Sequence, residues 1–67
     1  MMKYDVNDNV RVVYINYEHK NRQQVPFQGV KGMKGKIYKK SVTEQAYFVR
    51  LYSGHQVFLY EDEIELI

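Results

Sequence analysis

The chain has 67 residues, which is enough for one small domain spanning residues 1–67. Its hydrophobic fraction of 45% and aromatic fraction of 15% are too high for a disordered chain. It contains no Cys, which excludes disulfides and thiolate metal sites. Because so small a fold offers little concave volume, we expect a non-enzymatic binding module with no cofactor, no metal and no small-molecule substrate.

The formal net charge is only +2, but the charges are unevenly distributed along the chain. Residues 20–40 contain seven Lys or Arg and no acid, whereas residues 61–65 contain four acids and no base. No apolar run reaches the roughly 18 residues that span a bilayer, and the first residues lack the apolar core of a signal peptide. We therefore expect a cytoplasmic protein that makes no membrane contact.

Strand patterns recur along the whole chain, and no segment has the periodicity of an amphipathic helix. The candidate strands are rich in Val, Ile, Phe and Tyr and are separated by polar turn residues. In chain order they are residues 10–17, 36–38, 46–52, 56–60 and 64–67. Residues 61–63 are too few for an α-helix and fit a single 3₁₀ turn before the last strand. The sequence thus predicts an all-β fold of five strands, as a small barrel or sandwich.

The turn around Gly54 sets the register of the third and fourth strands. A two-residue loop would place Val49 opposite Phe58, whereas a three-residue loop over 52–54 places Val49 opposite Val57. We favour the second register because it gathers the aliphatic residues on one face and places Gly54 where a bulged turn needs a left-handed residue. The predicted core is then Val10, Val12, Ile37, Val49, Leu51, Val57, Leu59 and Ile64.

The same alternation predicts a basic and aromatic outer face. If Ile37 points inward, its neighbours on the second strand point outward and lie beside the outward residues of the third strand. The residues expected there are Lys34, Lys36, Tyr38, Lys40, Phe48 and Arg50. Cations bind phosphates and flat rings stack on unpaired bases, so this face predicts weak binding of single-stranded RNA or DNA. The alternative is that the lysines serve solubility and protect a strand edge.

A long polar loop over residues 18–29 offers a second candidate surface. Val25, Pro26 and Phe27 could anchor a protein partner together with Phe58 and other exposed aromatics, or they could fold back over one end of the barrel. The first alternative describes a protein–protein interaction module, such as an accessory protein of a phage or mobile element.

The remaining polar residues carry weaker signals. His19 and His55 are expected to be exposed, and a metal site would require carboxylates brought from elsewhere. The acids Glu61, Asp62, Glu63 and Glu65 are expected to form a solvated turn and edge. The spacing of Gly29, Gly32 and Gly35 does not match a phosphate-binding loop, and Gly32 and Gly35 are instead expected to permit a sharp bend into a strand. Neither Ser41 nor Ser53 lies in a nucleophile elbow.

The order of these segments resembles the SH3-like barrel superfamily. The resemblance is carried by NVRVV at residues 9–13, GMKGKI at 32–37, YFVRL at 47–51 and LYEDEIEL at 59–66. The Gly-x-x-Gly-x-Ile segment is similar to KOW-type members, which occur in RNA-binding ribosomal and transcription proteins, and the acidic turn is similar to small prophage SH3-like proteins. The resemblance implies a five-stranded barrel with a long first loop. The chain lacks Trp and an Ala-Leu-Tyr-Asp-Tyr motif, so a polyproline-binding groove is not implied.

Overall fold

The computed structural model describes residues 2–20, 22 and 29–67, and these residues form a small all-β domain. Its elements in chain order are β1 (Asn9–Val12), β2 (Lys34–Ser41), β3 (Ala46–Leu51), β4 (Gln56–Tyr60), the 3₁₀ helix η1 (Glu61–Glu63) and β5 (Ile64–Leu66). The predicted 3₁₀ turn is therefore confirmed. The first strand is shorter than predicted, because beyond Val12 the backbone turns to η1, where the Val13 amide donates to the Glu63 carbonyl.

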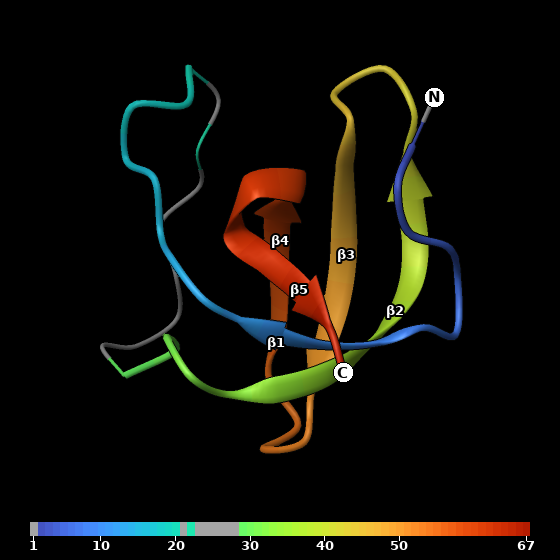
Figure 1. Ribbon diagram of the computed structural model, residues 1–67, viewed down its shortest axis with the longest axis vertical. Helices are drawn as coiled ribbons and strands as arrows, with labels where there is room; N and C mark the ends of the chain where they lie inside the picture. The colour runs from blue at the N-terminus through green and yellow to red at the C-terminus, as the bar shows by residue number, and fades with distance from the viewer. Residues whose placement is uncertain (1, 21, 23–28) are drawn as a thin grey trace.

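The strands form one antiparallel sheet in the order β4-β3-β2-β1-β5. Figure 1 shows the strong curvature of this sheet, with β1 and β5 crossing in front of β3 and β4. Within the described ranges no strand pairing joins β4 to β5, so the sheet is open and the predicted closed barrel is not formed. The all-β, five-stranded prediction is confirmed.

The concave face of the sheet holds the core, and all eight predicted core residues are buried. Tyr4, Val30 and Tyr47 are buried with them, and sequence reasoning did not place these in the core. The predicted register of β3 and β4 is also confirmed, because Val49 lies opposite Val57 and Gly54 has a φ of 97°. Burial alternates over the last three residues of β3, since Val49 and Leu51 are buried and Arg50 between them is exposed.

A bulge in β2 corrects one prediction about the outer face. Ile37 pairs with Val49, but Lys39 rather than Tyr38 pairs with Phe48, so the register shifts by one residue at Tyr38. Beyond the bulge Lys39 shares the outer face with Phe48, and Lys40 lies opposite the buried Tyr47. The Lys40 ammonium is 3.0 Å from an Asp5 carboxylate oxygen, away from the predicted binding surface. The prediction that Lys40 belongs to the outer face is wrong, because an inserted residue reverses the alternation of side chains.

Gly35 allows β2 to approach β3 closely. A Cβ atom at this position would lie 2.6 Å from the Arg50 carbonyl oxygen and 2.9 Å from a Val49 methyl carbon. Both atoms belong to β3, the neighbouring strand, in which Leu51 is the pairing partner of Gly35. Gly32 has a φ of 93° in the turn before β2. Gly32 therefore fits the predicted bend into β2, whereas Gly35 is required by the close approach of β2 and β3 rather than by a bend.

Glu63 joins the long loop to η1 through a buried ion pair. Its side chain is 0% exposed, and the Arg22 side chain that pairs with it is only 4% exposed. The Glu63 carboxylate also accepts hydrogen bonds from the backbone amides of Asn16 and Tyr60, at 2.7 and 2.8 Å. The prediction of a wholly solvated acidic turn is therefore wrong at Glu63, because Arg22 of the loop and the backbone amides of Asn16 and Tyr60 surround its carboxylate.

Arg22 also covers the free edge of β4. The Leu51 amide donates to the His55 carbonyl, so the alternating antiparallel pattern points the Phe58 carbonyl away from β3. The Arg22 guanidinium donates to that Phe58 carbonyl. The loop thus binds part of an edge that would otherwise be open to pairing with another chain.

Candidate functional site

Three of the predicted site residues line one pocket on the outer face. Lys36, Tyr38 and Arg50 converge from β2 and β3 around a volume of about 370 Å³. Asn7 and Tyr52 complete the polar and aromatic lining, and the outer face predicted from the sequence included neither residue. Ile37 of β2 and Leu51 of β3 also line the pocket. None of these lining residues is acidic, so the pocket combines two cations with two aromatic rings.

The two rings of this pocket are held in place by hydrogen bonds. The Tyr38 hydroxyl donates to the Gln56 side-chain oxygen at 3.2 Å, and the Tyr52 hydroxyl donates to the Asn9 side-chain oxygen at 3.1 Å. The Arg50 guanidinium lies over the Tyr38 ring, 5.2 Å from its centroid. Such a cation over a ring is favourable and orients both groups. The pocket therefore presents a cationic and aromatic surface.

The other predicted residues of this face lie around the pocket. Lys34 is exposed on β2, next to Gly35 and two residues from Lys36. Phe48 is partly buried and the Lys39 ammonium lies 5.4 Å above its ring centroid. Lys39, which sequence reasoning left out, thus occupies the position on the outer face that was assigned to Lys40. Ile37 is followed by Tyr38, Lys39 and Lys40, and no aliphatic residue there shows which side chains point toward the core. The sequence therefore carried no signal for this shift.

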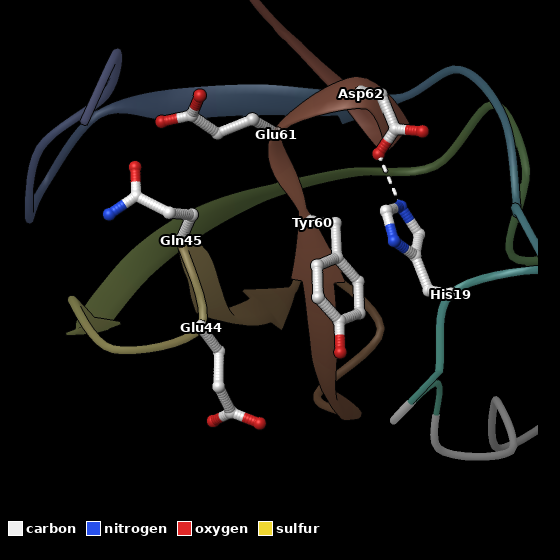
Figure 2. Close-up of a pocket in the computed structure, with 6 residues that line it drawn as sticks. All are labelled: His19, Glu44, Gln45, Tyr60, Glu61 and Asp62. Atoms are coloured by element: carbon white, nitrogen blue, oxygen red, sulfur yellow. Dashed lines mark hydrogen bonds and ion pairs between the residues drawn. The ribbon is translucent and has the colours of Figure 1, made fainter. Parts of the chain in front are cut away.

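A second pocket, of about 340 Å³, lies at the opposite end of β3 and is acidic. Figure 2 shows its lining, in which Glu44 and Gln45 come from the β2–β3 turn and Tyr60, Glu61 and Asp62 from the end of β4 and η1. His19 closes one side from the long loop. Within the described residues no group of three His, Cys, Asp or Glu side chains is arranged to hold a metal ion.

His19 is part of the folded structure rather than an exposed loop residue, which corrects the sequence-based expectation. Its ring stacks on Tyr60 with centroids 3.9 Å apart and planes inclined by 12°. Its Nε2 atom lies 2.8 Å from an Asp62 carboxylate oxygen, as the dashed line in Figure 2 marks. Burial opposes ionisation of Asp62, but hydrogen bonds from His19 and Asn16 outweigh it and lower the pKa of Asp62. His55 is exposed, as expected, and its Nδ1 atom contacts Ser53.

Two other acids of the 61–65 segment are also engaged by neighbours. The Tyr47 hydroxyl and the Lys3 amide donate to Glu61, and both hydrogen bonds lower the pKa of its carboxyl group. Glu65 lies 3.8 Å from the Arg11 guanidinium, where both side chains are largely exposed. Of these contacts, the one with Arg11 brings a positive charge to the acidic segment.

Phe58 is not available to a protein partner in the way that the sequence suggested. It is only 7% exposed and forms a separate apolar cluster with Ala46, Tyr60 and the partly buried Phe48. Its ring meets Phe48 and Tyr60 in edge-on contacts, with centroids 4.9 and 5.5 Å apart. The other residues proposed for a protein partner, Val25, Pro26 and Phe27, lie outside the described residues.

Comparisons with known proteins do not assign this arrangement to a family. No family model matches the chain, and no curated protein or solved structure matches it significantly. Over the part of the chain that the structure describes, no helix is long and apolar enough to cross a membrane.

Proposed function

We propose that the chain is a non-enzymatic binding module built on an opened variant of the SH3-like barrel. The strand order supports this proposal, because β5 returns to pair with β1 while β2, β3 and β4 form a continuous meander. The 3₁₀ turn immediately before β5 is the second feature in common with that fold. The SH3-like assignment remains a proposal about architecture, and the function rests on the pocket itself.

We propose that this module binds single-stranded RNA or DNA weakly through its outer face. The observation that carries the proposal is the convergence of Lys36, Arg50 and Tyr38 on one pocket whose lining contains no acid. Phosphates are attracted by the two cations, and an unpaired base stacks on the exposed tyrosine ring. Lys34 and Lys39 extend the positive charge along the same face. Duplexes are poorer ligands, since their bases are already stacked on one another.

The experiment is a fluorescence anisotropy titration of mixed-sequence single-stranded oligonucleotides at low salt. Tyr38→Ala should weaken binding by about 1–3 kcal/mol if a base stacks on this ring. Lys36→Ala should also weaken binding, whereas Lys40→Ala should leave it nearly unchanged although it removes the same charge. The Lys40 variant is the matched control, because its ammonium faces Asp5 and not the pocket.

Two results would contradict the proposal. One is a folded domain that binds no oligonucleotide at submillimolar concentrations. The other is an equal loss of affinity in the Lys36 and Lys40 variants, because that would indicate an effect of net charge alone. Circular dichroism of each variant verifies that the sheet is intact.

A further inference from the structure

We infer that the pocket between β2 and β3 receives a single base, so the domain holds one nucleotide of a strand rather than a run of stacked bases. This inference rests on the proposed function and specifies the form of its ligand. It follows from which rings are accessible, from the size of the pocket and from the charge around it.

Accessible rings are confined to the pocket end of the outer face. Tyr38 is 38% exposed and Tyr52 is 66% exposed, and both line the pocket. The remaining aromatic residues on this face, Phe48, Phe58 and Tyr60, are buried or partly buried and pack against one another. Phe48 packs edge-on against Phe58, Phe58 is buried between its two neighbours, and the stacked His19 ring covers Tyr60. A second base would therefore find no ring along β3 and β4 as exposed as those of the pocket.

His19 blocks the access of a base to the Tyr60 ring. Parallel stacking at a centroid distance of 3.9 Å is the arrangement that a base would adopt on Tyr60. The Arg22 guanidinium carbon lies 5.3 Å from the centroid of the same ring. Both residues belong to the loop that the buried Glu63 carboxylate anchors, so a base would have to displace anchored side chains to reach Tyr60.

Charge also opposes the extension of a strand to the far end of β3. The pocket of Tyr38 adjoins Arg50 at one end of β3, and the acidic pocket adjoins Gln45 at the other. Glu44, Glu61 and Asp62 at that second end repel phosphates. The volume of about 370 Å³ lies near the lower limit of small-molecule pockets, which hold roughly 300–1,000 Å³. The volume of the pocket and the charges around it therefore both indicate a site for one base with its adjoining phosphates.

The test measures affinity against strand length with fluorescently labelled oligothymidylates of roughly two, four, eight and sixteen nucleotides. A longer strand offers a one-base site more bases that can occupy it, but each of them binds with the same affinity. Each doubling of length should therefore tighten Kd by no more than about twofold. A strand that contacts successive stacking sites should gain far more, since each additional stacked base is worth about 1–3 kcal/mol, or roughly five- to 150-fold.

Substitutions of tyrosine residues identify the base site when they are tested with the shortest and the longest oligonucleotide. Tyr52→Ala should weaken the two-nucleotide and sixteen-nucleotide ligands by the same factor, roughly five- to 150-fold. Tyr17→Ala is the matched control, because Tyr17 is 69% exposed and does not line the pocket. Circular dichroism and thermal unfolding of both variants verify that the sheet remains folded.

The outcomes separate this inference from the proposed function. Tightening clearly greater than twofold per doubling of length would overturn the one-base site while leaving nucleic-acid binding intact. A loss in Tyr52→Ala that grows with strand length would also overturn it. Absence of binding at every length would contradict the proposed function, and the inference with it.

Discussion

Tyr47 shows how a single polar group is accommodated in this core. Its ring is 0% exposed, and its hydroxyl accepts from the Tyr4 amide at 2.9 Å while donating to Glu61. Burial and the hydrogen bond to Glu61 together raise the pKa of Tyr47 to about 12 from its usual 10. The folded protein therefore strongly favours the neutral phenol of Tyr47 over its phenolate.

The raised pKa of Tyr47 predicts a loss of stability in alkaline solution. In the unfolded chain this phenol ionises near pH 10, but in the folded protein it ionises only near pH 12. Its contribution is complete below pH 10 and is lost as the pH rises from 10 to 12. Urea midpoints measured across this interval should fall more steeply for the wild type than for Tyr47→Phe. Parallel pH profiles for the two proteins would contradict this assignment.

At the scale of elements, the register of the sheet follows from its apolar residues where these are present on both strands. Val49 and Val57 could be paired from the sequence because each lies in an alternating run with aliphatic residues on one side. The end of β2 offers no such guide, since Ile37 is followed by Tyr38, Lys39 and Lys40. The sequence therefore did not predict the bulge, and Lys40 was assigned to the wrong face.

The contact between the long loop and η1 was equally inaccessible to sequence reasoning. Arg22 and Glu63 are separated by 41 positions, and charged residues are expected at the surface unless a partner is known. The same limitation applies to Asn7 and Tyr52, which enter the pocket from outside the strands. Alternation within one strand predicts a face, but it does not predict which loops meet that face.

The loop anchor leads to a prediction about stability. Glu63→Ala leaves Arg22 buried without its partner, and removing one member of a buried ion pair costs about 3–5 kcal/mol. We expect this loss in the free energy of unfolding measured with urea. Glu65→Ala is the control, because its contact with Arg11 is exposed and such pairs contribute about 0–1 kcal/mol. Equal losses in the two variants would show that Glu63 does not anchor the loop.

At the scale of the whole molecule, the two pockets divide the surface by charge. The pocket near Arg50 combines cations with exposed rings, whereas the pocket near Gln45 combines carboxylates with a ring that His19 already covers. A net charge of only +2 conceals this separation. An anionic strand is therefore attracted to one end of β3 and repelled from the other, which favours a single mode of binding.

The most direct test of this central claim is a two-dimensional NMR titration of the labelled domain with a short single-stranded oligonucleotide at low salt. We predict saturable amide shifts at Lys36, Tyr38, Arg50 and Tyr52, with Tyr60 and Asp62 nearly unchanged. All of these shifts should follow one binding isotherm and weaken as salt is added, because phosphate contacts release counterions. The claim would be contradicted by shifts centred on Tyr60 and Asp62, or by a spectrum that does not change at millimolar oligonucleotide.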